Sequence, residues 1–80
     1  MNTYEKLIEI FTEVFGNEME LSKVTESSKL TDDLGINSIG MLYMAMAIES
    51  GFGIKFENGD FEKLITVADV IGVIDSKKKK

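Results

Sequence analysis

Apolar residues recur every three or four positions along the first part of the chain, which is the spacing of one face of a helix. These residues are Tyr4, Leu7, Ile8, Phe11, Val14 and Phe15. Asn2 and Glu5, three residues apart, resemble a capping box at the start of such a helix, and Gly16 is a natural stop after it. The pattern therefore predicts a helix over residues 3–15.

The next segment, residues 17–37, loses this periodicity, and its apolar residues stand apart from one another among polar ones. They are Leu21, Val24, Leu30, Leu34 and Ile36. A connection of this length without its own secondary structure is unusual in a compact domain. We therefore expect a long loop that these side chains anchor to the core.

A second helix is expected to start at Ser38 with Asn37 as its cap, because an asparagine oxygen accepts hydrogen bonds from the first-turn amides. We expect it to run to about Ser50 and to end at Gly51. Both of its faces are apolar. One face carries Met41, Met44, Ala45 and Ile48, continued by Phe52, and the other carries Ile39, Tyr43, Met46 and Ser50, flanked by Gly40, Leu42 and Ala47.

Apolar and polar residues alternate over residues 52–56, which predicts an extended connection whose apolar side chains reach the core. Residues 57–60 indicate a turn, and Asp60 is expected to cap a short helix that ends near Leu64. Thr66 and Asp69 have the spacing of a capping box for a last helix that closes on lysines. Its apolar face carries Val67, Val70, Ile71 and Ile74.

These elements predict an all-α fold, a four-helix bundle of three main helices and one short helix, with a long loop between the first two. We expect residues 1–80 to form a single domain in which residues 77–80 are a basic C-terminal tail. No internal repeat interrupts this plan.

Charge and composition exclude several classes of function. The net charge is −5, and without the four lysines at 77–80 five lysines stand against fourteen acids, a charge of −9. A domain with this negative charge repels nucleic acids and anionic membranes, so we expect neither as a partner. The chain has no histidine, cysteine or arginine, which removes the usual nucleophile, base and metal-ligand sets. We therefore expect no catalytic residues and no metal site. Residues 1–11 lack the basic segment and apolar run of a secretory signal, and no uncharged stretch approaches membrane-spanning length, so we expect a cytoplasmic protein. We also expect a monomer.

Ser38 is the candidate for chemistry on this chain. With Asn37 as the cap, the Ser38 hydroxyl is not needed for capping, and Gly35 permits a sharp backbone turn before the helix. The amides and the positive dipole end of a helix favour an anion at this position. No side chain nearby is suited to activate the hydroxyl, so any modification has to be made by another protein. The alternative is a serine with only a structural role at a helix start.

Four segments together resemble the acyl carrier proteins, the phosphopantetheine-binding carrier family: DDLGINSIGM, VTESSKL, FGIKFE and LITVADVI. The resemblance covers nearly the whole chain. The family's Asp-Leu-Gly and Asp-Ser-Leu motifs match Asp33, Leu34 and Gly35, followed by Asn37, Ser38 and Ile39. The resemblance implies that a phosphopantetheinyl transferase attaches 4'-phosphopantetheine from coenzyme A to Ser38. It also implies that the magnesium ion for this step is bound by the transferase and not by this chain. The arm then presents acyl groups as thioesters to acyl-processing enzymes, for fatty acid, polyketide or related biosynthesis.

The chain departs from the family pattern at the serine and along the second helix. Asn37 replaces the usual aspartate, and Gly40, Tyr43 and Ala47 stand where fatty-acid carriers have acids, which leaves Glu49 as the main acid. We therefore expect an apolar partner-docking face, the alternative being that another part of this chain covers these side chains. It comprises Ile39, Gly40, Leu42, Tyr43 and Met46.

Two interpretations remain open at this point. The three methionines at 41, 44 and 46 either repack around variable cargo or simply fill the core. The chain as a whole is either a carrier or a small helical interaction module that is never modified.

Overall fold

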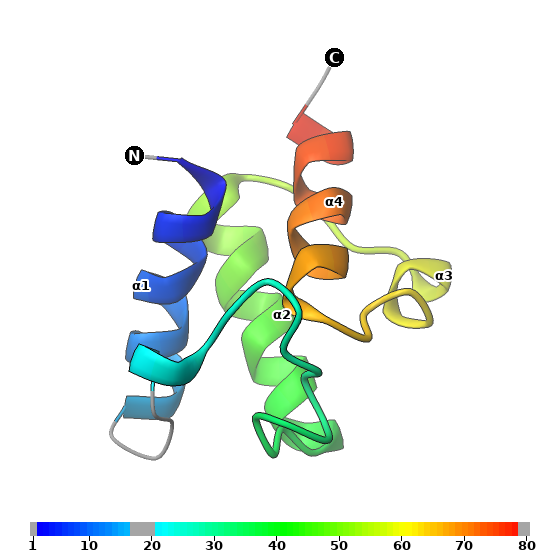
Figure 1. Cartoon of the computed structure of the whole chain (residues 1–80). Coiled ribbons are helices and arrows are strands. Elements are labelled where there is room, and N and C mark those ends of the chain that lie inside the picture. The colour runs from blue at the N-terminus through cyan, green and yellow to red at the C-terminus, as the bar shows by residue number, and fades with distance from the viewer. Residues whose placement is uncertain (1, 17–20, 79–80) are drawn as a thin grey trace.

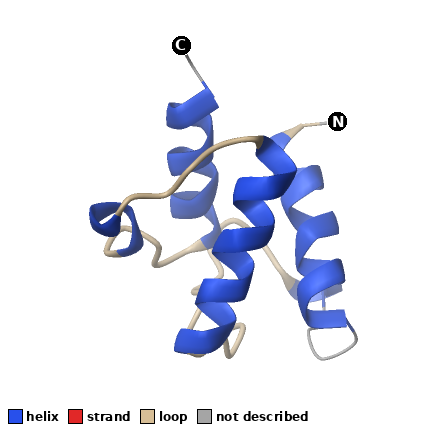
Figure 2. Cartoon of the chain, turned by 180° about the vertical axis from the view of Figure 1, so that it is seen from behind, coloured by secondary structure: helices blue, strands red, loops and turns tan. Residues whose placement is uncertain are grey.

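The computed structural model describes residues 2–16 and 21–78, and within them the chain is helical (Figure 1). Its elements are α1 (Thr3–Phe15), the 3-10 helix η2 (Leu21–Lys23), α2 (Ser38–Phe52), α3 (Asn58–Phe61) and α4 (Val67–Lys78). Helix α1 packs against both α2 and α4. Seen from behind, α2 lies in front, between α1 and α4 (Figure 2). The predicted all-α fold, with three main helices, one short helix and a long connection after the first, is confirmed.

Helix α1 begins and ends where the sequence predicts. Asn2 Oδ1 accepts a hydrogen bond from Glu5 N at 2.8 Å, and Glu5 Oε1 accepts one from Asn2 N at 3.3 Å. These two bonds form the predicted capping box. At the other end Gly16 adopts a φ of +58°, which glycine tolerates without a steric cost.

Helix α2 is longer than predicted, because it continues through Gly51 to Phe52, with Gly53 as its C-cap. Gly53 takes the left-handed conformation with a φ of +68° and donates its N–H to the Glu49 carbonyl at 2.9 Å. The prediction of a stop at Gly51 was wrong. A Cβ at Gly51 would lie 2.9 Å from Ile10 Cδ1, so this glycine lets α1 approach α2 closely.

Helix α3 both starts and ends earlier than predicted, since it ends at Phe61 and not near Leu64. It covers Asn58–Phe61, so the expected turn is its first turn, and the expected cap Asp60 lies inside it. The Asp60 carboxylate accepts from the Glu57 N–H at 2.8 Å and thus stabilises the start of the helix from its third position. The predicted start at Asp60 was wrong because this side chain bonds backwards along the chain.

The last helix begins at the predicted capping box. Thr66 N donates to Asp69 Oδ2 at 2.9 Å, and Asp69 N donates to Thr66 Oγ1 at 3.2 Å. At the other end Lys77 and Lys78 belong to the final turn of α4 rather than to a tail, and Lys79 and Lys80 lie outside the described residues. Lys77 Nζ lies 2.8 Å from Asp60 Oδ2, and this contact lowers the pKa of Asp60 below its usual value.

The loop before α2 is anchored as predicted, and it also contains η2, which the sequence pattern did not indicate. Val24, Leu30 and Ile36 are buried and Leu34 is half-buried; the side chain of Leu21 lies outside the described residues. Backbone bonds hold the loop against the start of α4, from Leu30 N to the Ile65 carbonyl at 2.9 Å and from Val67 N to the Ser28 carbonyl at 3.0 Å.

The start of α1 and the end of α4 are joined by polar contacts. Thr3 Oγ1 donates to Asp75 Oδ1 at 2.7 Å, and Lys78 Nζ donates to Thr3 Oγ1 at 3.3 Å. Lys6 and Lys78 also lie over the ring of Phe52, with their Nζ atoms 5.0 and 5.5 Å from its centroid. Figure 1 shows these ends of α1 and α4 at one end of the molecule, and the start of α2 at the other.

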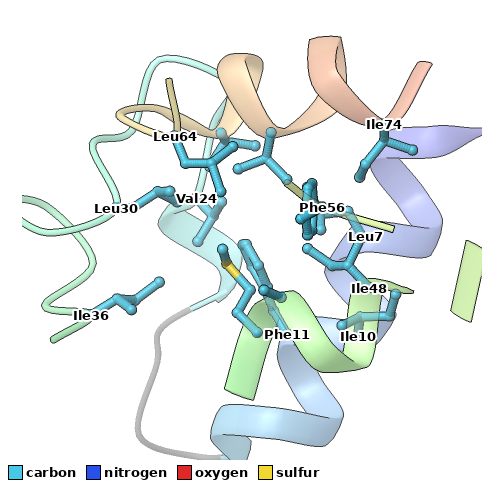
Figure 3. Close-up of a cluster of buried hydrophobic side chains, with 14 residues drawn as sticks. Leu7, Ile10, Phe11, Val24, Leu30, Ile36, Ile48, Phe56, Leu64 and Ile74 are labelled. Carbon is cyan, nitrogen blue, oxygen red and sulfur yellow. The ribbon is translucent and has the colours of Figure 1, made fainter. Parts of the chain in front are cut away.

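A single hydrophobic cluster fills the space between the helices (Figure 3). Leu7 and Phe11 from α1, Met44 and Ile48 from α2, and Ile74 from α4 are fully buried within it. Phe56 of the extended connection is buried there as well, as the alternating pattern predicts. Phe52, in contrast, belongs to α2 and not to the connection.

Removing one methyl group from this core should lower stability measurably. Ile48→Val is expected to reduce the free energy of unfolding by about 1 kcal/mol, because a fully buried side chain loses contacts that the core does not recover. Ile65 is 58% exposed, so the same change there, Ile65→Val, should stay within about 0.5 kcal/mol. Urea unfolding of both variants measures the difference, and equal losses would contradict this view of the core.

Candidate functional site

Helix α2 starts with a side-chain cap from Asn37. The backbone of Asn37 is extended, with φ −88° and ψ −177°, and its Oδ1 accepts from the Gly40 N–H at 2.7 Å. The Asn37 carbonyl accepts from Met41 N at 2.8 Å and so begins the helical series. The cap therefore satisfies one of the free first-turn amides and leaves the Ser38 side chain out of the capping geometry.

Ser38 is the first residue of α2, and its side chain is exposed. Within residues 2–16 and 21–78 no hydrogen bond to its hydroxyl is present. The hydroxyl lies at the positive end of the helix dipole, where negative charge is stabilised. This position suits the attachment of an anionic group.

The turn before Ser38 explains the Asp-Leu-Gly sequence in physical terms. Asp33 Oδ2 accepts from Lys29 N at 2.8 Å and closes the turn, while Leu34 is half-buried against the core. Gly35 has a φ of +71°, a left-handed conformation that side chains oppose. Its N–H donates to the Thr31 carbonyl at 3.1 Å. The three residues thus fix the direction from which the chain reaches Ser38.

An apolar strip runs along the outer side of α2. It consists of Ile39, Leu42, Tyr43 and Met46, with exposed fractions of 57–63%. We call these four residues the α2 strip. Met44, by contrast, is fully buried and Met41 half-buried, so of the three methionines only Met46 belongs to the exposed surface.

Gly40 does not share the outward face on which the sequence places it. A Cβ at this position would lie 3.1 Å from Ile36 Cγ2 and 3.4 Å from Phe15 Cε1. Gly40 therefore faces the loop and the end of α1. It lies beside the α2 strip and is not part of it. The helical wheel alone missed this, because the residues that contact Gly40 come from distant segments.

Glu49, which the sequence leaves as the main acid of α2, is engaged inside the molecule. Its Oε2 accepts from the Phe56 N–H at 2.7 Å, and the residue is half-buried. This bond holds the extended connection after α2 in place. The α2 strip therefore has no acidic side chain beside it that faces a partner. In this respect it differs from a docking face that is recognised by its charge.

A groove lies between the end of α1 and the start of α2, with a volume of about 280 Å³. Its lining residues come from α1, from the loop and from the first turns of α2. They are Val14, Phe15, Leu34, Gly35, Ile36, Asn37, Ile39, Gly40 and Tyr43. We call it the α1–α2 groove. The sequence pattern did not reveal it, because only the packing of three separated segments creates it.

Two further features are absent from the residues that the structure describes. Residues 2–16 and 21–78 contain no group of three or more acidic, histidine or cysteine side chains placed to hold a metal ion. In the same residues no helix has the length and apolar character needed to cross a membrane.

Comparison with known proteins shows the family to which the chain belongs. Residues 5–74 match the family model described as a phosphopantetheine attachment site. The acyl carrier protein of Thermotoga maritima is 39% identical to this chain over 74 residues, which cover 92% of this chain and 89% of that protein. The chain therefore belongs to the phosphopantetheine-binding carriers, and within them to the acyl carrier proteins.

Membership of this family defines the role of the chain. It is a carrier rather than an enzyme, and it bears a covalently bound 4'-phosphopantetheine group. Its partners are the transferase that attaches this group and enzymes that process the acyl cargo.

The cap at the start of α2 can be tested by two substitutions of one side chain. Asn37→Ala removes the acceptor for Gly40 N and should lower the free energy of unfolding by about 1 kcal/mol. Asn37→Asp keeps the acceptor and adds a negative charge at the helix N-terminus, which should raise stability by about 0.5 kcal/mol at low salt. Urea unfolding measures both, and identical midpoints for all three proteins would show that the cap contributes nothing.

Proposed function

We propose that Ser38 is the residue that carries 4'-phosphopantetheine. The observation that carries this proposal is the exposed Ser38 hydroxyl at the first position of α2, beside a cap that uses the neighbouring Asn37 instead. The site fits the group, because a phosphodiester on this oxygen lies at the positive end of the helix dipole. The α1–α2 groove, which the neighbouring Asn37 and Ile39 line, leaves room for an arm beside the serine.

Ser38 Oγ acts as the acceptor in the loading step. It forms a bond to the phosphorus that bears the pantetheine chain of coenzyme A, the bond between the two phosphates breaks, and adenosine 3',5'-bisphosphate leaves. The hydroxyl proton passes to a base of the transferase, because the chain contains no histidine. Once bound, the group supplies the thiol that the cysteine-free chain lacks and on which acyl groups are held.

Loading at Ser38 has a direct test by intact mass spectrometry. After incubation with coenzyme A and a broad-specificity phosphopantetheinyl transferase, the protein should gain the mass of one phosphopantetheine group. Ser38→Ala should gain nothing, because the acceptor oxygen is gone. Ser27→Ala, at an exposed serine of the loop, is the matched control and should load fully.

Two results would contradict the proposal. One is loading of Ser38→Ala to the same extent as the unchanged protein. The other is no loading of the folded, unchanged protein, which would favour the alternative of an unmodified interaction module.

The α2 strip is proposed as the surface on which partner enzymes dock. Its four apolar side chains are more than half exposed, and an apolar patch of this kind commonly marks an interface. Because Glu49 is engaged with Phe56 N, we expect partners to recognise this strip by apolar burial. Charge would then contribute less to the on-rate than it does for acidic docking faces.

Placing a charge on the strip should weaken docking without unfolding the protein. Tyr43→Glu and Met46→Glu should each raise the KM of the loaded carrier with a partner enzyme about tenfold, equivalent to about 1.4 kcal/mol. Ala68→Glu places the same charge at an exposed position of α4 and should leave the KM unchanged. Circular dichroism verifies the fold, and normal KM values for both strip variants would exclude this surface.

The pathway and the setting of the carrier are proposals as well. We propose a role in fatty acid, polyketide or related biosynthesis, because these pathways use acyl carriers of this architecture. The net charge of −5 supports a monomer, since like charge keeps copies apart. A cytoplasmic location stays a prediction from the sequence.

A further inference from the structure

We propose that Asn58 is a site of spontaneous modification, at which the side-chain amide is lost and replaced by a carboxylate. The backbone N–H of Gly59 is the nucleophile, and water is the co-reactant. The inference concerns α3 and does not depend on the proposed attachment at Ser38.

The reaction joins the side chain of Asn58 to the backbone of the next residue. Gly59 N loses its proton and bonds to Asn58 Cγ, the bond from Cγ to Nδ2 breaks, and ammonia leaves. Water then opens the resulting succinimide ring. Cleavage between the ring nitrogen and Cγ gives aspartate, and cleavage between the nitrogen and the main-chain carbonyl carbon gives isoaspartate. In isoaspartate the backbone runs through Cβ and Cγ and is one carbon longer.

Both reacting residues are accessible. Asn58 and Gly59 are exposed, and nothing lies within 4 Å of a Cβ placed on Gly59. Glycine has no side chain of its own to hinder attack by its nitrogen. Gly59 also lies in the first turn of α3, where backbone N–H groups have no acceptor within the helix. The nucleophile is therefore neither covered nor held by the helical hydrogen bonds.

The other asparagines in the described part of the chain are held by their side chains. Asn2 Oδ1 accepts from Glu5 N at 2.8 Å, and Asn37 Oδ1 accepts from Gly40 N at 2.7 Å. Within the same part of the chain the side chain of Asn58 makes no hydrogen bond. Its amide can thus turn toward the next backbone nitrogen, which makes this asparagine the reactive one.

Helix α3 offers little resistance to the rotation of the Asn58 backbone that the attack requires. It has four residues, none of them buried, and lies beside α4 at the edge of the molecule (Figure 1). Asp60 fastens its first turn, because its Oδ2 accepts from Glu57 N at 2.8 Å and lies 2.8 Å from Lys77 Nζ. Short exposed elements of this kind open at a low cost in free energy.

The two products differ in their effect on these contacts. The extra backbone carbon of isoaspartate lies between Glu57 and Asp60, so the Asp60 carboxylate no longer meets Glu57 N. Its contact with Lys77 is displaced as well, which releases α3 from the last turn of α4. Aspartate leaves the backbone unchanged and adds only a negative charge.

The test is to age the whole unloaded protein in warm, mildly alkaline buffer and to map its peptides by mass spectrometry. Asn58 should change from amide to acid, as a mixture of aspartate and isoaspartate, while Asn2 and Asn37 stay intact. Gly59→Ala is the matched control, because the position has no positive φ and has room for a methyl group. This Cβ hinders the attacking nitrogen and should slow the loss of the amide about tenfold.

A second readout separates the two products. In the isoaspartate form the Glu57 N–H loses its acceptor and should exchange with solvent about tenfold faster than in the unaged protein. Asn58→Asp, which carries the charge without the longer backbone, should keep the slower rate. Equal exchange rates in the isoaspartate form and in Asn58→Asp would overturn the proposed release of α3.

The proposed site has its own contrary outcomes. The same ageing of the protein unfolded in urea gives the rate at which Asn58 reacts without any fold. An amide that is lost in urea but stays intact in the folded protein would show that α3 protects Asn58, and would overturn the proposal. A rate that Gly59→Ala leaves unchanged, or equal loss at Asn37, would overturn it too. Ser38→Ala should age like the unchanged protein, which keeps this result separate from the test of loading.

Discussion

The hydrogen bond from Gly40 N to Asn37 Oδ1 is the contact on which the site depends. At 2.7 Å it fixes the first turn of α2 and makes the Ser38 hydroxyl unnecessary for capping. It also places Gly40, which has no side chain, against Ile36 and Phe15, and so it shapes the groove beside the serine. Compared with the aspartate usual in the family, Asn37 provides the same acceptor without a charge. The cap is retained, but the proposed loading site has one negative charge fewer.

Helix α2 is apolar on two sides for two different reasons. Met44 and Ile48 face inward and complete the core, whereas the α2 strip faces outward with nothing from the described chain covering it. Glu49 bonds to the Phe56 N–H instead of facing a partner. The docking proposed for this strip would depend on the removal of apolar surface from water, which salt screens much less than it screens attraction between charges.

Local patterns were sufficient to predict most of the fold, including the Asn37 cap at the start of α2. The capping residues Asn2, Asn37 and Thr66 act within three residues of themselves, so the sequence predicts the helix starts that they stabilise. The predictions for Gly51 and for Asp60 as a cap were wrong, because close packing on Ile10 and a bond back to Glu57 decide their roles. The groove and the inward bond of Glu49 depend on contacts between distant segments, which periodicity does not encode.

The polar contacts of Thr3 with Asp75 and Lys78 hold the start of α1 and the end of α4 together, opposite the start of α2. Because these helix ends and the start of α2 lie at opposite ends of the molecule, the point of attachment determines which end faces the solution. A solid support or a fused domain attached beyond either of these helix ends leaves the serine directed away from the attachment. Immobilised in this orientation, the carrier offers the proposed attachment site at Ser38 to enzymes in solution.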